Sequence, residues 1–88
     1  MKDSRKLERI FKGPANHWRI EILMLVDKNP QITLHDIATK LQANFKTISE
    51  HNKKLVAAGL VRKEYLGREV THILSPYGEK ICHILKIF

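Results

Sequence analysis

Basic and polar side chains between residues 45 and 58 have the types and spacing needed to hold nucleic acid. A helix that turns Ile48 and Leu55 inward exposes most of them on its opposite face. The outward set is Lys46, Thr47, Glu50, Lys53 and Lys54, with Ser49 and His51 at its two edges. Lysines neutralise phosphates, and lysine and threonine also hydrogen-bond to base edges. The pattern therefore favours a DNA-contacting helix over its alternative, a solvated helix surface.

Position along this helix divides the expected roles. The N-terminal end of a recognition helix enters the major groove first, so we expect Lys46 and Thr47 at base edges. Lys53 and Lys54 lie further along and are better placed for phosphates. Glu50 is unfavourable near phosphate but can accept a hydrogen bond from cytosine N4.

A second basic element follows the helix. Residues 61–66 and 70–74 are typical of two strands, and Gly67-Arg68 between them suits a two-residue type II′ turn. This register sets Tyr65 opposite Val70 and favours packing between them over stacking of Tyr65 on a base. Arg68 at the turn can enter a minor groove or hold a phosphate. Arg62 and Lys63 add charge on the first strand.

The remaining helices must position these two elements. Apolar spacing predicts helices at about 4–11, 16–28, 33–41 and 76–88, besides the one from Phe45 to Ala58. Phe45, Ile48, Leu55 and Val56 are expected on its inner face. The predicted fold class is mainly α with a small β-hairpin (α+β), a winged helix-turn-helix in the order α-α-α-α-β-β-α. It forms one domain, residues 1–88, with the helix-turn-helix at about 33–58 and the wing at about 61–74.

Size and charge agree with a small DNA-binding protein. The chain has 88 residues, 43% of them hydrophobic, which suffices for one core. Its net charge of +7 attracts polyanions. The longest apolar run, residues 22–26, is too short for a membrane span, and the charged start lacks a secretory h-region. With Cys82 as its only cysteine, we expect a cytoplasmic protein without membrane contact.

These motifs together resemble a known family, the ArsR-type winged helix-turn-helix regulators. Residues 15–23 are similar to the opening of the family's core helix, in which an Arg precedes an Ile-Leu pair. Residues 47–51, with Lys53, Leu55 and Ala58-Gly59-Leu60-Val61, resemble its recognition helix and the exit into the wing. Residues 67–70 resemble the wing tip. The same motifs also fit MarR-type regulators, so both subfamilies stay open.

Three departures from the family pattern limit what the resemblance implies. Glu50 stands where the family often has a basic or polar residue. Asn52 replaces the usual Leu and puts a polar group that needs a partner inside the helix. The cysteine pair of metal-sensing members is missing from residues 34–41, so metal sensing of that type is not implied.

The end helices carry apolar residues that a short domain cannot easily cover alone. They are Leu7, Ile10 and Phe11 near the start, and Ile84, Ile87 and Phe88 at the end. Because ArsR-type proteins pair through such helices, the resemblance implies a homodimer with two recognition helices about one DNA turn apart on a palindromic site. The alternative is that the N-terminal strip packs on its own C-terminal helix.

No residues suggest catalysis, a cofactor or a built-in metal site. Glycine-rich phosphate loops and a G-x-S-x-G motif are absent, and no two histidines have zinc-motif spacing. Glu79, Cys82 and His83 share one side of the last helix and could form a metal site only across a dimer. A half-buried thiol beside polar groups is the preferred interpretation. No small-molecule effector is evident.

The sequence therefore predicts a non-enzymatic, sequence-specific regulator of transcription that binds double-stranded DNA, with repression by exclusion of the transcription machinery as the favoured mode. Two alternatives remain: a winged-helix module that binds another protein, and an architectural DNA binder without sequence preference. Salt-sensitive binding to DNA would separate the regulator from the protein-binding module. A higher affinity for a selected site than for random duplex would separate it from the architectural binder.

Overall fold

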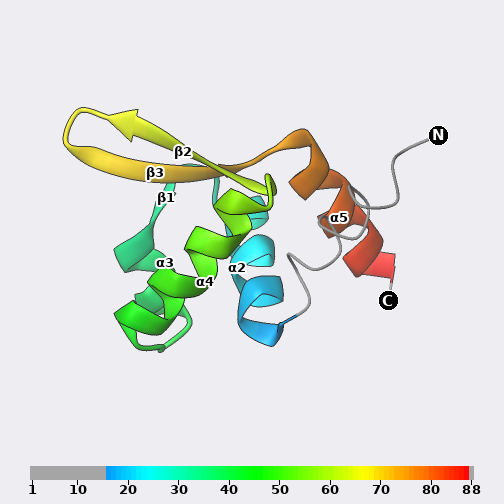
Figure 1. Ribbon diagram of the computed structural model, residues 1–88, viewed down its shortest axis with the longest axis horizontal. Helices are drawn as coiled ribbons and strands as arrows, with labels where there is room; N and C mark the ends of the chain where they lie inside the picture. Colours follow the sequence, from blue (N-terminus) through cyan, green and yellow to red (C-terminus); the bar gives the residue numbers. More distant parts are fainter. Residues whose placement is uncertain (1–15, 88) are drawn as a thin grey trace.

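Helices and a small antiparallel sheet surround one apolar cluster in the computed structural model, which describes residues 16–87 (Figure 1). In this part of the chain the elements follow the order α-β-α-α-β-β-α. Their bounds are α2 His17–Lys28, β1 Ile32–Thr33, α3 Leu34–Lys40, α4 Phe45–Ala57, β2 Val61–Leu66, β3 Glu69–Leu74 and α5 Pro76–Ile87. The architecture is the predicted α+β winged helix-turn-helix.

The predicted element order is wrong at one place, because a short strand precedes α3. Ile32 pairs with His72 and Thr33 pairs with Thr71, which adds β1 to the edge of the hairpin. Gln31, at a φ of 70°, turns the chain into this strand and donates its N–H to the His72 carbonyl. Two residues are too few to show an alternating pattern, so β1 leaves no signal in the sequence. The helix expected at about 4–11 lies outside the described residues.

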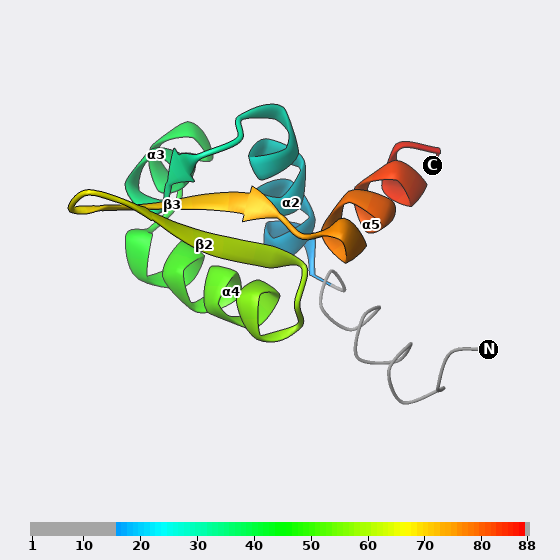
Figure 2. The ribbon, with the colours of Figure 1, turned by 90° about the horizontal axis from the view of Figure 1, so that it is seen from above.

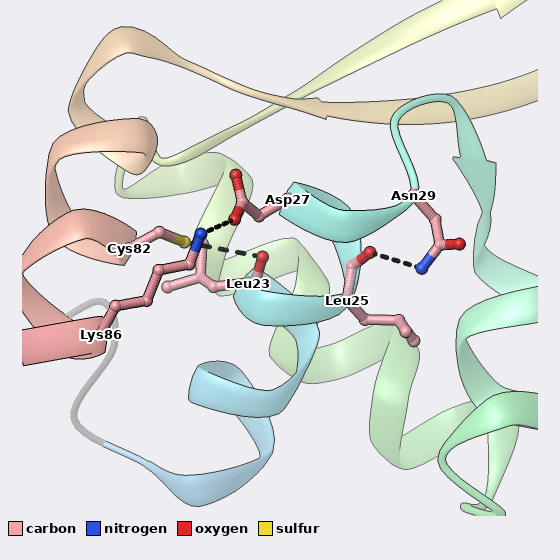
Figure 3. Close-up of polar contacts among 6 residues, drawn as sticks. All are labelled: Leu23, Leu25, Asp27, Asn29, Cys82 and Lys86. Carbon is pink, nitrogen blue, oxygen red and sulfur yellow. Dashed lines mark hydrogen bonds and ion pairs between the residues drawn. The ribbon is translucent and has the colours of Figure 1, made fainter.

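Helix α2 is the central helix, and apolar residues cover much of its surface. Its residues Ile22, Leu23 and Val26 are buried. The helix is capped by Asn16, whose Oδ1 accepts the Trp18 N–H at 2.9 Å. At the other end the Asn29 side chain donates to the Leu25 carbonyl at 3.1 Å and closes the last turn (Figure 3).

Helices α3 and α4 form the helix-turn-helix. Thr33 caps α3 by accepting the Asp36 N–H at 3.1 Å, as the capping spacing predicts. Gln42, at a φ of 52°, reverses the chain between the helices. Helix α4 ends at Ala57, and Gly59 follows with a φ of 78°, the left-handed conformation expected after a helix end.

The hairpin has the predicted register. Tyr65 pairs with Val70, and Leu66 pairs with Glu69 across the turn. Gly67 has a φ of 62° whereas Arg68 does not share a positive φ, which matches the type II′ turn. Strand β3 lies between β1 and β2, and the hairpin extends across α3 and α4 (Figure 2).

Helix α5 returns to α2 and fixes the base of the hairpin. Ser75 caps α5, because its Oγ accepts the Gly78 N–H at 3.0 Å, and its hydroxyl donates to the Gly59 carbonyl. Further along, the Cys82 thiol donates to the Leu23 carbonyl at 3.6 Å. Lys86 and Asp27 form an ion pair at 2.7 Å beside it (Figure 3). The root of the hairpin is therefore attached to the core through both α4 and α5.

Candidate nucleic-acid interface

Helix α4 separates an apolar inner face from a charged outer face. Ile48 and Leu55 are fully buried, and Asn52 between them is 2% exposed. The opposite side carries four exposed charged residues, which are Lys46, Glu50, Lys53 and Lys54. Because the inner residues pack into the shared core, the charged ridge is held in one orientation on a rigid element.

Three polar residues of α4 lie at the margins of the charged ridge. Thr47, Ser49 and His51 are each half-buried, so the structure places them at the margins of the ridge rather than on its crest. The helical period predicts that Thr47 faces outward with the lysines. It lies instead on the same side as His51, which contacts α2, so its side chain is only partly accessible to a groove.

The N-terminal end of α4 presents side chains rather than backbone donors. Asn44 Oδ1 accepts the Lys46 N–H at 2.8 Å and the Thr47 N–H at 3.3 Å. A helix N-terminus often holds a phosphate with these N–H groups, but here the cap already satisfies them. The donors that remain at this end therefore lie mainly on the side chains of the first turn.

Phe45 departs from the expected inner face. It is the first residue of α4 and its side chain is 53% exposed. The helical period assigns it an angle close to that of Asn52, but the first residue projects beyond the edge of the core, where no element covers it fully. The N-terminal end of α4 thus carries an exposed aromatic ring beside Lys46.

A hydrogen bond links α4 to the central helix α2. Arg19 Nε–H donates to His51 Nδ1 at 3.3 Å. The acceptor role requires the neutral Nε2–H tautomer of His51. Desolvation, followed by the charges of Arg19 and Lys54, lowers the pKa of His51, which favours this neutral form. Helical spacing alone does not identify this partner of Arg19 on α4, because the two residues are 32 positions apart.

The hairpin supplies exposed arginines on an apolar support. Arg62 on β2 and Arg68 at the turn are both exposed. Tyr65 lies opposite Val70 as predicted but is 73% exposed, so the pairing covers little of its ring. Nearer the base His72 is buried, and its Nδ1–H donates to the Ile32 carbonyl at 3.0 Å.

Of the residues predicted to form the dimer interface, only Ile84 and Ile87 lie in the part of the chain that the structure describes. Ile84 is 38% exposed and Ile87 is 71% exposed, so α5 carries an apolar strip that the described part of its own chain leaves open. Leu7, Ile10, Phe11 and Phe88 lie outside the described residues.

Other chemistry on the described residues is limited. Cys82 is buried more deeply than expected, and burial raises the pKa of its thiol to about 11, which keeps it protonated. Within residues 16–87, no three His, Cys, Asp or Glu side chains gather as metal ligands would. None of the helices in this range combines the length and hydrophobicity needed to cross a bilayer.

Known structures share this fold closely. A transcriptional regulator, HlyU from Vibrio vulnificus CMCP6, is 26% identical, with a TM-score of 0.81 over 96% of this chain and 88% of its own. The homodimeric winged helix-turn-helix DNA-binding domain of Mb0332 from Mycobacterium bovis is 22% identical, with a TM-score of 0.84 over 98% of this chain and 85% of its own. The transcriptional repressor PagR of Bacillus anthracis is 21% identical, with a TM-score of 0.84 over 92% of this chain and 93% of its own.

A comparison with curated protein sequences gave no match. The family model for bacterial regulatory proteins of the arsR family, in contrast, matches residues 17–63. This match runs from α2 through the helix-turn-helix into β2 and covers more than half of the chain. It confirms the predicted family and the expectation of a non-enzymatic protein: the chain belongs to the ArsR family of DNA-binding transcriptional regulators.

Proposed function

We propose that this regulator acts as a repressor, binding a palindromic operator as a homodimer and excluding the transcription machinery from the promoter. In each protomer α4 occupies the major groove and the hairpin reaches the neighbouring part of the duplex. Residues 1–88 act as one domain, in which the end helices serve dimerisation.

The observation that carries this proposal is the charged ridge of α4, since Lys46, Lys53 and Lys54 are all exposed above a fully packed inner face. The N-terminal end of α4 and the turn of the hairpin lie at the same end of the molecule in both views (Figures 1 and 2). A duplex at that end meets the helix and the turn together. Arg68 at the turn is exposed there, so its guanidinium group can bind a phosphate or enter the minor groove.

Within the ridge we assign base-edge contacts to Lys46 and to the margin residues Thr47, Ser49 and His51. Glu50 accepts from a cytosine amino group. Lys53, Lys54 and Arg62 neutralise phosphates. The cap at Asn44 supports this division, because it leaves first-turn side chains as the donors at the groove-facing end.

The homodimer rests on the exposed apolar strip of α5. Most of the surface of Ile87 is in contact with water. Covering it with a second copy of the chain lowers the free energy, because apolar surface is removed from water. The domain of Mb0332 is described as homodimeric, and PagR is described as a repressor. Both have the fold of this chain, so we extend pairing and repression to it as proposals.

Selection of bound sequences from a random DNA pool at physiological salt tests the proposal. We expect an inverted-repeat consensus whose half-sites are centred about 10–10.5 base pairs apart, or a multiple of this, because a two-fold dimer places its helices on one face of the duplex. Enrichment of a single unrepeated site would refute the dimeric mode. Retention of DNA with no consensus would instead indicate an architectural binder.

A further inference from the structure

Exposed large apolar side chains in residues 16–87 fall into two groups. Ile84 and Ile87 belong to the α5 strip. The others lie on the first residue of α4 and the outer half of the hairpin, and they are Phe45, Tyr65, Leu66 and Val70. Dimerisation through α5 does not account for this second group. Phe45 lies at the end of α4 that enters the major groove in the proposed complex, so we consider a contact between this residue and DNA.

Helix stability does not require an aromatic ring at Phe45. The start of α4 is secured by the Asn44 side chain, which accepts from the Lys46 and Thr47 N–H groups. The ring is 53% exposed, so it contributes little to the core. An alanine would serve the helix at least as well. Phe45 therefore holds an apolar surface in water at the one end of α4 that enters a groove.

The surroundings of Phe45 suit a base rather than a phosphate. It lines a shallow depression of about 580 Å³ together with Leu34 and Val70. Asp36 and Glu69 also line this depression, and their carboxylates repel the DNA backbone. An apolar surface suits the methyl group that thymine presents on the floor of the major groove, and neighbouring carboxylates can accept only from the amino groups of adenine and cytosine there.

We propose that Phe45 is a specificity-determining residue that contacts the 5-methyl group of a thymine in each half-site. Thymine is the one base that offers a methyl group in the major groove, and phenylalanine is one of the side chains that contact it. The inference rests on the proposed function, because it requires α4 to lie in the major groove. It adds a base preference that the polar residues of the ridge do not supply.

Replacing thymine by deoxyuridine in the selected duplex tests the contact, because the change removes only the methyl group. At the thymine that Phe45 contacts, the wild-type dissociation constant should rise about fourfold per half-site. This is the loss expected when the complex no longer buries one methyl group. Substitution in both half-sites should raise it about fifteenfold. Phe45→Ala should bind more weakly and show no difference between the two duplexes. Phe45→Leu, which keeps an apolar group, should retain part of the difference.

Leu66→Ala is the matched control, because Leu66 is a similarly exposed apolar residue on the hairpin. It should keep the full wild-type ratio of uracil to thymine affinities at that position. The thermal midpoint of Phe45→Ala should match that of the wild type, which separates removal of the thymine interaction from damage to the fold.

Three results would overturn the inference while leaving DNA binding intact. They are a consensus without thymine in the half-sites, a wild-type protein that ignores every thymine-to-uracil change, and a Phe45→Ala variant that keeps the wild-type ratio. Failure of the wild-type chain to bind any duplex would overturn the proposed function together with this inference.

Discussion

Asn52 puts an amide into the apolar interior of α4, between two residues that are fully buried. Its Oδ1 atom has no hydrogen-bond partner among the described residues. Leucine has the same branched shape without the polar atoms, so Asn52→Leu should raise the free energy of unfolding by about 1–2 kcal/mol. Thermal unfolding measures the gain, at roughly 4–8 °C per kcal/mol for a domain of this size.

Asn52→Ala is the control for this prediction. It also removes the amide but leaves an unfilled space, so it should gain less stability than the leucine variant. A lower thermal midpoint for Asn52→Leu would show that the site has no room for two methyl groups and would refute the account.

The histidines make stability depend on pH. Desolvation is the leading cause that lowers the pKa of both His51 and His72 from the ordinary value of about 6.5. The unfolded chain therefore binds more protons than the folded protein below that pH. Stability is fully present above about pH 6.5 and is lost as pH falls through the lowered values.

Thermal midpoints measured from about pH 7 down to about pH 5 check this prediction. His51→Gln keeps an acceptor for Arg19 but cannot titrate, so its midpoint should fall less than that of the wild type. We assign the decrease in thermal midpoint that remains in His51→Gln to protonation of His72, whose pKa is also lowered by burial. Equal falls in the two proteins would show that protonation of His51 does not weaken its contact with Arg19.

Single residues also show what the sequence can and cannot predict. Helical period alone places Lys46, Lys53 and Lys54 outside and Ile48 and Leu55 inside, because α4 packs along a single face. The same period fails for Phe45, since burial of a first-turn residue depends on where the hairpin and α3 lie. The partnership of Arg19 and His51 joins residues 32 positions apart and likewise depends on tertiary packing.

At the scale of elements, α5 approaches the base of the hairpin very closely. A Cβ atom added to Gly78 would lie 2.1 Å from the Leu60 carbonyl oxygen, which is backbone and cannot rotate away. Gly78→Ala should therefore push α5 outward and lower the free energy of unfolding by about 1–3 kcal/mol. Thermal unfolding measures the loss.

Lys80→Ala in the same helix controls for placing an alanine on α5, because Lys80 is exposed and lies outside the close contact with Leu60. It should leave the midpoint almost unchanged. If Gly78→Ala proved as stable as Lys80→Ala, the close packing of α5 on Leu60 would not be a constraint in solution.

Elements differ in how far local sequence determines them. Gly67-Arg68 fixes the hairpin turn, and the turn fixes the pairing of Tyr65 with Val70, so this register could be predicted. Strand β1 has no such local signal. It forms because Gln31 turns Ile32 and Thr33 alongside β3, which is a consequence of the assembled sheet.

For the whole molecule, assembly depends on the proposed α5 interface. Ile87→Glu puts a charge into this interface, and because Ile87 is 71% exposed the fold of the single chain should not suffer. We expect a monomer by sedimentation, an unchanged thermal midpoint at low protein concentration, and weaker binding to an inverted repeat. A variant that still sediments as a dimer would exclude Ile87 from the interface.

The salt dependence of DNA binding tests the central claim, that the ridge of α4 holds the duplex, most directly. For several phosphate contacts, the wild-type association constant should fall about a thousandfold or more between about 50 and 200 mM salt. Lys53→Ala should reduce the slope of log K against log salt by about 0.9 for each phosphate that is no longer neutralised, or about two in a dimer. Lys80→Ala, with the same change in charge on α5, should leave the slope unchanged. A wild-type affinity that barely responds to salt, or equal slopes for all three proteins, would contradict the account.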